Sequence, residues 1–548
     1  MNKELFGVFG GRDAFSRFRS ELAFDTVVGG DAATVGIRDP GSGIPGRSTW
    51  YSGEEGTCVI WGEAFAAADN VTDTARWLLE RFAEDGRDAL GDLNGSYVAY
   101  VDHDGTALVA TDPLRSWEVF YADVGGLRVF STDVGAIKRV LDDPTVQRES
   151  LLEYLHLGTV LGERTLFERV RRAPFDGYLT GHDVGSFDRF VYEPREYDYA
   201  DELASRLGRA IGRRAHYPGS KGLLLSAGMD SRLLLSRVPN VEHTYTVGNP
   251  GAQEVDVARK LAHQYGASHE VLEPGGRYLQ PTDGKVRYGQ SIKESLHIHH
   301  AGYTDRMDAT TMYHGLLFDT LLKGYFLERD SLELFGAKLP LRRLDQDVDP
   351  VESLLDTLGY LPAGSERTAA ATAGLFSDVD LADPGEFLRE RLEIEYEKAR
   401  ERADSVHNAM DLLVIMNQPV LPFHTHLADN FLESFVALDA ELLDWHLTTP
   451  PAYRSDATYR RAIRRLDEDL LQHRPPDQPH SVARLNQIER FARRKLPWLE
   501  PFEPAWPDRE AVYDANDMDD ELFPVHRGVR DLPVRLKLRV NDARWWLE

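Results

Sequence analysis

The sequence predicts two domains: an α+β domain over residues 1–190, then an α/β domain over residues 200–548 with a helical C-terminal half. Three observations predict this. The chain of 548 residues is too long for a single hydrophobic core. Short alternating runs separated by Gly and Asp fill the first part, whereas strands alternate with helices after residue 200. From Ser353 onward the pattern is almost wholly helical.

The first domain is predicted to contain antiparallel strands and hairpins. Its strand candidates are residues 57–62, 96–101, 106–111, 118–121 and 127–131. Turn sequences such as Asp102-His103-Asp104-Gly105 separate these runs, which is typical of hairpins. Helices are expected over residues 73–85 and 150–157. The polar and irregular segment 181–199 is expected to link the two domains.

In the second domain the periodicity switches repeatedly between strand and helix. It predicts helices over 201–216, 229–238 and 254–265, and strands over 222–225 and 244–247. Strands that alternate with helices imply a mostly parallel sheet covered on both faces.

The charge balance argues against a nucleic-acid partner. Acidic residues outnumber basic ones by 90 to 63, which gives a formal net charge of -27. Such a surface repels the phosphate backbone of DNA and RNA. Because the excess is spread along the chain, it agrees with a halophilic source, and an acidic mesophilic protein is the alternative.

Neither a membrane span nor a disulfide is expected. No apolar segment is long enough to cross a bilayer, and the first seven residues lack the apolar core of a signal peptide, so we expect a cytoplasmic protein. The single cysteine, Cys58, rules out an intrachain disulfide and a thiolate-rich metal site. It lies in an apolar run and is expected to be a small buried hydrophobe.

The stretch Leu223-Leu224-Leu225-Ser226-Ala227-Gly228-Met229-Asp230-Ser231 carries the strongest functional signal. An apolar strand runs into three small residues and then into a helix. Small residues let an anion approach the backbone, and the free N–H groups and dipole at the helix start favour its charge. Ser226 and Ser231 add hydroxyl donors, and Asp230 can hold a Mg²⁺ that bridges phosphates. The alternative is an ordinary strand–helix turn with Asp as a cap.

This stretch resembles the SGGxDS pyrophosphate loop of the asparagine synthetase family, with Ala227 in place of one glycine. Three further stretches fit in the same order. Residues 244–248, 254–259 and 266–271 resemble the adenine-side strand and the helix–strand unit after it. Residues 313–325 resemble the second loop, SGEGxDExxGGY, and residues 435–450 resemble the PFLDxxLVEFALxLP region. The resemblance covers nearly the whole chain.

The resemblance implies an adenine-nucleotide α-hydrolase-like (ATP pyrophosphatase) domain, which cleaves ATP between the α and β phosphates. ATP and Mg²⁺ are the implied cofactors, and Asp230 and Asp319 are the implied metal ligands. The implied nucleotide-binding residues are Leu225, Ser226, Ala227, Gly228, Asp230, Ser231, Val247, His314 and Gly315. Among them, Leu225 and Val247 would contact the adenosine.

The second loop departs from the family pattern. Thr320 stands where a Glu follows the metal-binding Asp, and Leu317 and Lys323 replace glycines.

The family's catalytic Lys, which lies next to an aromatic residue, falls near Thr458-Tyr459, where this chain has no Lys. Arg460 and Arg461, with Arg464 nearby, are therefore the candidates that would stabilise the pentavalent phosphate or the leaving pyrophosphate. Arginine clamps phosphate well but shuttles protons poorly. The alternative is a solvated basic helix face.

Residues 57–141 also resemble the family's glutamine-hydrolysing domain, which is of the Ntn-hydrolase type. The matching stretches are Gly62-Glu63 (NGEIYN), 93–100 (LDGxFAFA), 110–115 (ARDxxG) and 130–133 (FASE). In the family the nucleophile is a Cys exposed as residue one, and its own amine acts as base. Here position two is Asn2, Cys58 lies mid-chain, and Asn94 replaces an Asp of the substrate-binding pair. We expect a degenerate glutamine amidotransferase-like domain that is inactive as a glutaminase.

The function predicted from the sequence is an asparagine-synthetase-like, ATP-dependent amide-forming ligase. A carboxylate, aspartate or a related acid, would be activated as an acyl-adenylate, with ammonia or an amine as the nitrogen donor. These small molecules are the expected partners, and a homodimer is a possible assembly. One alternative is a non-catalytic nucleotide-binding or scaffold descendant, which the missing Lys favours. A tRNA-modifying ATP pyrophosphatase is the other, which the acidic surface opposes.

The cluster His297, His299 and His300 is weighed as a metal site. Zinc needs three or four converging ligands, and no other His or Cys pattern supplies them. A polar rim near the cleft is the preferred interpretation.

Overall fold

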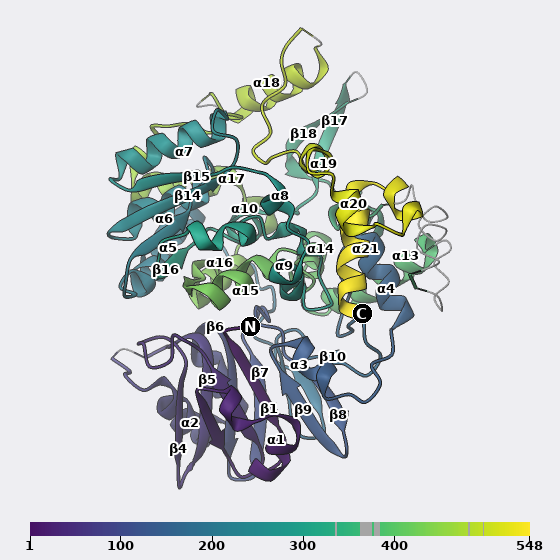
Figure 1. Ribbon diagram of the computed structural model, residues 1–548. Coiled ribbons are helices and arrows are strands. Elements are labelled where there is room, and N and C mark those ends of the chain that lie inside the picture. The colour runs from purple at the N-terminus through teal and green to yellow at the C-terminus, as the bar shows by residue number, and fades with distance from the viewer. Residues whose placement is uncertain (69, 335–336, 362–374, 377–383, 481–482, 497) are drawn as a thin grey trace.

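The computed structural model describes residues 1–68, 70–334, 337–361, 375–376, 384–480, 483–496 and 498–548. In Figure 1 the antiparallel sheets lie in the lower half of the molecule, and the parallel sheet lies at the upper left. The C-terminal helices, in yellow, lie at the upper right.

Two six-stranded antiparallel sheets build the first part of the chain. The first sheet has the order β10-β8-β9-β1-β3-β2 and the second β12-β11-β7-β6-β5-β4. The strands of the first are β1 (Glu4–Val8), β2 (Thr26–Gly29), β3 (Thr34–Arg38), β8 (Phe120–Val124), β9 (Leu127–Ser131) and β10 (Arg171–Arg172). Those of the second are β4 (Thr49–Gly53), β5 (Gly56–Ala66), β6 (Leu93–His103), β7 (Thr106–Thr111), β11 (Gly177–Leu179) and β12 (Val184–Ser186).

Alternation along each strand gives these sheets two buried faces. Leu5 of β1 and Trp61 of β5 lie in the core between the sheets. Phe6, the next residue of β1, faces outward and packs with α1 (Arg12–Phe18), α3 (Val134–Arg139) and α4 (Arg148–Leu157). Cys58 and Ile60 face α2 (Thr74–Asp85) on the other outer side. The result is four layers in the order α–β–β–α.

The sequence predicted much of this region. The strands over 57–62, 96–101, 106–111 and 127–131 and the helices over 73–85 and 150–157 are confirmed, and so is the burial of Cys58. The strand over 118–121 was placed too early: β8 begins at Phe120, because Glu118 leaves the sheet to bind Lys293 at 2.9 Å. The linker segment 181–199 contains β12, an edge strand of the second sheet.

A five-stranded parallel sheet forms the centre of the second part. Its order is β15-β14-β13-β16-β19, with β13 (Lys221–Leu224), β14 (Val241–Val247), β15 (Ser268–Leu272), β16 (Thr311–Tyr313) and β19 (Leu432–Ser434). The chain builds outward from β13 through β14 to β15, and then returns to add β16 and β19 on the opposite side of β13. The strand order therefore reverses between β13 and β16.

Helices cover both faces of this sheet. One face packs against α5 (Tyr199–Arg214), α6 (Met229–Arg237), α7 (Gln253–Gln264), α10 (Phe318–Lys323), α16 (Ala440–Thr448) and α17 (Asp456–Leu466). The other contacts α8 (Gly276–Leu279), α15 (Leu421–Asn430) and α19 (Arg509–Ala515). The helix and strand predictions between 201 and 265 are confirmed within a few residues.

The prediction of an almost wholly helical chain after Ser353 missed one strand. The other helices there are α11 (Pro350–Thr357), α13 (Gly385–Arg400), α14 (Val406–Met416), α18 (Ala483–Lys495), α20 (Met518–Leu522) and α21 (Val534–Leu547). However, β19 lies among them and pairs in parallel with β16. It is only three residues long and includes Glu433 and Ser434, so its pattern shows no apolar alternation. A hairpin of β17 (Arg329–Leu334) and β18 (Ala337–Leu344) precedes α11.

The two parts meet through a buried group of charges that we call the junction cluster: Glu63, Arg214, Tyr217 and Asp439. The Arg214 guanidinium lies 2.5 Å from Glu63 Oε1 and 2.6 Å from Asp439 Oδ2, and these three side chains are almost fully buried. The Tyr217 hydroxyl donates to Glu63 Oε2 at 2.8 Å. Although burial opposes its charge, Glu63 and Asp439 raise the pKa of Arg214.

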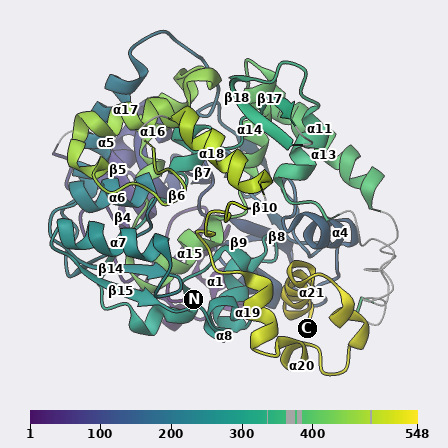
Figure 2. The same ribbon diagram turned by 90° about the horizontal axis from the view of Figure 1, so that it is seen from above.

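A second connection joins the end of the chain to the first part. Figures 1 and 2 both place α21 beside α4, and the two helices share one hydrophobic core. Arg539 of α21 donates to the carbonyl oxygens of Leu155 and His156, at 3.1 and 2.9 Å, where α4 ends. Its guanidinium also lies 2.8 Å from Glu294.

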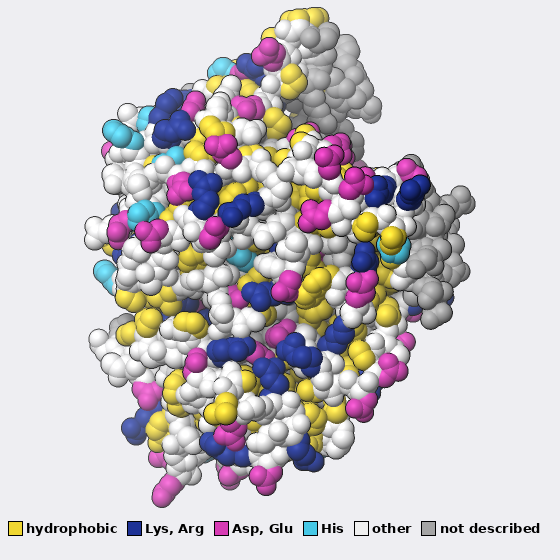
Figure 3. Space-filling view, viewed as in Figure 1, with side chains coloured by type: hydrophobic (Ala, Val, Ile, Leu, Met, Phe, Trp, Pro, Cys, Tyr) yellow, Lys and Arg dark blue, Asp and Glu magenta, His cyan; other side chains and the backbone are white. Residues whose placement is uncertain are grey.

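On the face shown in Figure 3, acidic and basic side chains are interspersed. In the part of the chain that the structure describes, no helix is both long enough and apolar enough to cross a membrane.

Candidate functional site

A cavity of about 630 Å³ opens at the carboxyl ends of β13 and β16. The loop 225–228 follows β13, the loop 314–317 follows β16, and both contribute to its wall. Open parallel sheets bind ligands where the strand order reverses, outside the carboxyl ends of the strands. The volume suits a ligand of nucleotide size.

Arg232 shapes the first loop. Its buried guanidinium donates to the carbonyl oxygens of Gly228, at 2.9 Å, and of Ala227. It also donates to the Leu470 carbonyl at 2.8 Å, so the loop is tied to the segment after α17. Burial lowers the pKa of Arg232 to about 10. The amide N–H groups of this loop already have acceptors within the protein: Leu225 donates to the Tyr245 carbonyl, Ser226 to Ser231 Oγ, Ala227 to Glu254 and Gly228 to Ser226 Oγ. A bound anion would have to displace one of these acceptors.

One of those amides already holds a carboxylate. Ala227 N–H donates to Glu254 Oε1 at 2.6 Å, and Glu254 lines the cavity. Burial raises the pKa of Glu254, and the bond from Ala227 opposes that rise. An anionic group therefore sits on this loop, and a phosphate that entered the cavity would lie beside it.

Gly315 allows the two loops to approach each other. A Cβ built on Gly315 would lie 2.7 Å from Asp230 Cβ, so a larger residue there would push the loops apart. In the first loop, Ser231 Oγ accepts the N–H of Ser226 at 3.0 Å, and Ser226 Oγ accepts that of Gly228 at 3.1 Å. Both hydroxyls therefore lie against the loop backbone.

Three charged side chains meet beside the cavity: Asp230 in the first turn of α6, Asp319 in the first turn of α10, and Lys323 at the end of α10. We call them the cavity cluster. Lys323 Nζ lies 2.9 Å from Asp230 Oδ2 and 2.7 Å from Asp319 Oδ1. It also lies 5.4 Å from the centre of the Tyr459 ring. Burial and the charge of Asp319 raise the pKa of Asp230. Burial alone would lower the pKa of Lys323, but the charges of Asp230 and Asp319 raise it.

The cavity cluster has the chemistry to hold one divalent cation with help from a ligand. Asp230 Oδ1 is buried and has no hydrogen-bond partner among the described residues. Mg²⁺ binds through one or two carboxylates and takes its remaining ligands from phosphates and water. Within the described ranges no group of three or more His, Cys, Asp or Glu side chains is arranged to hold a metal alone. With Lys323 bound to both aspartates, a metal here would therefore depend on bound phosphate oxygens.

His314 connects the second loop to the first part of the chain. Its Nε2 and His424 Nδ1 both bind Glu433 Oε1, the latter at 2.9 Å, and all three groups are buried. Although burial opposes ionisation, His424 and His314 lower the pKa of Glu433. His424 Nε2 in turn lies 3.3 Å from the hydroxyl of Ser96 on β6. This chain of contacts fixes the second loop to the antiparallel sheet.

The structure brings most of the sequence-predicted residues to one cavity. The lining includes Leu225, Ser226, Gly228, Asp230, Ser231, Val247, His314, Gly315, Asp319 and Arg460. Ala227 is fully buried behind the loop and acts only through its backbone.

Of the two arginine candidates, Arg460 lines this cavity and Arg461 does not. Arg461 is 60% exposed, and its guanidinium lies 3.7 Å from Asp198 Oδ1, at the cap of α5. Consecutive residues of a helix point about 100° apart, so only one of the two can face the cavity.

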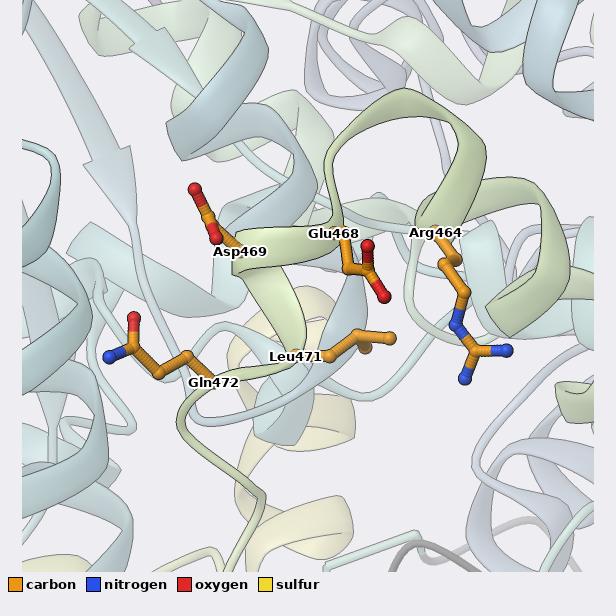
Figure 4. Close-up of a pocket in the computed structure, with 5 residues that line it drawn as sticks. All are labelled: Arg464, Glu468, Asp469, Leu471 and Gln472. Carbon is orange, nitrogen blue, oxygen red and sulfur yellow. The ribbon is translucent and has the colours of Figure 1, made fainter.

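Arg464 lines a separate and open recess between α17 and the turn at Glu468–Leu471. In Figure 4, Arg464, Glu468 and Leu471 extend toward a common space, whereas Asp469 and Gln472 point away from it. The side chains do not converge on one point, and we assign this recess no role.

The cavity is also lined by His297, His299 and His300, which the sequence placed at a polar rim near the cleft. Trp506 and Arg509, which carried no signal in the sequence, complete this wall. The His299 ring stacks on Trp506 at 4.3 Å. Burial, with Arg509 next in importance, lowers the pKa of His299 well below its usual range, so this imidazole is neutral. Lys323 was noted only as a lost glycine, and Glu254 and Arg232 were not singled out.

The first part of the chain has no accessible thiol. Cys58 is fully buried, and burial raises its pKa. At the start of β1, Asn2 Nδ2 donates to the Asp429 carbonyl at 3.1 Å, and Lys3 Nζ binds Asp39 at 3.0 Å. Residues 2 and 3 therefore lie against α15 and the first sheet, and neither carries a nucleophilic sulfur.

Comparison with known proteins adds little to this geometry. No family model matches the chain, and no curated protein matches it. The solved structures that match include two at 12% identity: glutamine phosphoribosylpyrophosphate (PRPP) amidotransferase from B. subtilis complexed with ADP and GMP, and the allosteric regulatory enzyme of purine biosynthesis. The first alignment covers 57% of this chain and 74% of the other, with a TM-score of 0.24. The second covers 59% and 70%, with a TM-score of 0.22. The likeness to amidotransferase structures is distant, and no functional argument rests on it.

Proposed function

We propose that the chain is an ATP-dependent ligase that activates a carboxylate as an acyl-adenylate and transfers the acyl group to ammonia or an amine. The observation that carries this proposal is the cavity at the strand-order reversal. Two loops there set backbone amides, hydroxyls and the cavity cluster around a space of about 630 Å³. The resemblance of both loops to those of the asparagine synthetase family supports the same reaction.

In the proposed first step a carboxylate oxygen of the substrate attacks the α-phosphate of ATP. The bond between the α and β phosphates breaks, and pyrophosphate leaves. The loop 225–228 would hold the phosphates once its amides exchange their present acceptors for phosphate oxygens, and Arg460 would face the developing charge. Bound Mg²⁺, held at Asp230 Oδ1 and completed by phosphate oxygens and water, would neutralise phosphate charge.

In the second step the nitrogen lone pair attacks the acyl carbon, AMP leaves, and the nitrogen loses a proton. The wall formed by His299, Trp506 and Arg509 would receive the acyl substrate. Arg509 offers one cation, and the stacked rings of neutral His299 and Trp506 offer a flat apolar surface. Aspartate or a related acid is the proposed substrate, and the nitrogen would not come from a glutaminase in the first part of the chain.

The runner-up is a nucleotide-binding protein without turnover. Lys323 and Thr320 favour it, because they replace residues of the family's second loop, and no Lys lies beside Tyr459 in sequence. The position of Lys323 Nζ, 5.4 Å from the Tyr459 ring centre, opposes it, since an ammonium reaches that place from another helix.

The deciding experiment is pyrophosphate release from Mg-ATP with aspartate and ammonium, and then with a panel of other carboxylates, in low and high salt. Asp230→Ala and the exposed Arg461→Ala serve as paired controls. Release that needs a carboxylate, survives in the Arg461 variant and disappears in the Asp230 variant supports the ligase. Calorimetric ATP binding without release on any acid favours the runner-up, and absence of both overturns the nucleotide assignment.

A further inference from the structure

The cavity cluster places a side-chain cation between two carboxylates. Asp230 lies in the first turn of α6 and Asp319 in the first turn of α10. Lys323 Nζ lies within 2.9 Å of an oxygen of each. The Lys323 side chain is 16% exposed, which is the same as that of Asp230, so the ammonium is largely removed from water. Two carboxylates that face one point beside an anion-binding loop form the usual seat of a divalent cation.

We propose that Lys323 is a built-in cation that fills the bridging position between Asp230 and Asp319, so that this position takes no divalent metal. The inference rests on the proposed function for its ligand, the polyphosphate of a nucleoside triphosphate. Its first claim, that the ammonium excludes a metal from the bridge, concerns the protein alone.

The geometry limits where a metal can still bind. Asp230 Oδ2 and Asp319 Oδ1 are engaged by Lys323, whereas Asp230 Oδ1 is free of partners among the described residues. A single cation at Asp230 Oδ1, completed by phosphate and water, is compatible with this arrangement. A second cation shared by both aspartates is not, because the ammonium occupies the space and cancels one of the two negative charges.

A built-in ammonium also changes how the site responds to its surroundings. Lys323 is tethered to α10, and so its charge is present at any metal concentration. Its approach to Tyr459 adds a cation–π contact at 5.4 Å. The nucleotide would therefore meet a partly neutralised acidic pair even before a metal arrives.

The test measures Mn²⁺ binding to the nucleotide-free protein by electron paramagnetic resonance. The variants are Lys323→Ala, Lys323→Arg, Asp319→Asn, and Lys323→Ala combined with Asp319→Asn. We expect no Mn²⁺ at this place in the wild type or in Lys323→Arg. We expect one new site in Lys323→Ala, lost again when Asp319 is neutralised. A wild-type site that Asp319→Asn alone removes would overturn the proposal, as would the absence of any gained site in a folded Lys323→Ala protein.

A second measurement brings in the nucleotide. ATP affinity is compared by calorimetry with EDTA and with saturating Mg²⁺. We expect less than a 10-fold difference for the wild type and at least a 50-fold difference for Lys323→Gln, which keeps a polar side chain about one bond shorter if Lys323→Ala fails to fold. Equal metal dependence in both proteins would contradict the inference. If neither protein binds ATP while the Mn²⁺ results hold, the proposed function fails and the bridging role of Lys323 stands.

Discussion

In both the junction cluster and the cavity cluster, one cation lies between two carboxylates from distant segments. The clusters differ in whether a carboxylate oxygen is left without a partner. At the junction every carboxylate oxygen of Glu63 and Asp439 has a partner, and both side chains are at most 1% exposed. In the cavity Asp230 Oδ1 has none among the described residues, and Asp319 is 53% exposed. Among the described residues Arg214 Nη2 lacks a partner at the junction, but no carboxylate oxygen of Glu63 or Asp439 does. Carboxylates with all their partners hold the two parts together, whereas a carboxylate oxygen without one beside a cavity is available to a ligand.

The largest effect is expected from Arg214→Met. This change removes the buried cation that joins Glu63 to Asp439 and leaves them only the longer contacts of Arg47, at 3.8 Å, and Arg213, at 3.2 Å, which costs about 3–5 kcal/mol of unfolding free energy. Arg213→Met is the matched control, since Arg213 binds the same Asp439 but is 27% exposed, and about 1 kcal/mol or less is expected. Urea unfolding of the full chain measures both. Equal losses in the two variants would show that burial is not what distinguishes the junction.

Arg232→Met should weaken ATP binding by about 10–100-fold, because the Ala227 and Gly228 carbonyls lose their donors and the loop loses its shape. Arg237→Met changes the same type of residue at the exposed end of the same helix and should leave the affinity unchanged. Calorimetry at one salt concentration compares them. An unchanged affinity in the Arg232 variant would remove the first loop from the site.

Glu254→Gln should strengthen ATP binding by about 3–10-fold at pH 8, because it removes a negative charge beside the phosphates while an oxygen still accepts Ala227 N–H. Burial raises the pKa of Glu254, so acidification protonates it at a higher pH than an exposed glutamate and should tighten binding in the wild type. The variant should lose that component, and the titration of ATP itself is common to both proteins. A parallel pH profile for the two proteins would refute this role.

The smallest effect separates two neighbours. Arg460→Ala should weaken ATP binding or slow pyrophosphate release several-fold, since Arg460 faces the cavity. Arg461→Ala should change neither by more than about 2-fold, because its exposed ion pair with Asp198 contributes little. The reverse order of effects would place the wrong face of α17 in the site.

How much of this the sequence could predict depended on how local each feature is. The first loop was found because strand, small residues and helix follow each other within nine residues, 223–231. Lys323 was overlooked because its contact with Asp230 spans 93 positions and exists only when α6 and α10 meet. Arg460 and Arg461 could not be separated, since the rotation of α17 is set by its packing on α5 and α10.

The strands show the same limit. The long strand β6 can be recognised from its own residues. By contrast, β19 has three residues, two of them polar, and it forms because β16 offers an edge for pairing. Two histidines, one of them on the second loop, bind the buried carboxylate of Glu433 and offset the cost of burying it. Such a strand is specified by its neighbours and not by its own pattern.

The packing of α21 on α4 has a consequence for how the chain is made. A ribosome delivers α21 roughly 380 residues after α4, which at about 5–20 residues per second takes roughly 20–75 s. During that interval the apolar side chains of α4, including Leu151 and Leu155, lack the α21 side chains that complete their burial. The first part of the chain therefore completes its core only after α21 has been made, and chaperones would have that long to bind it.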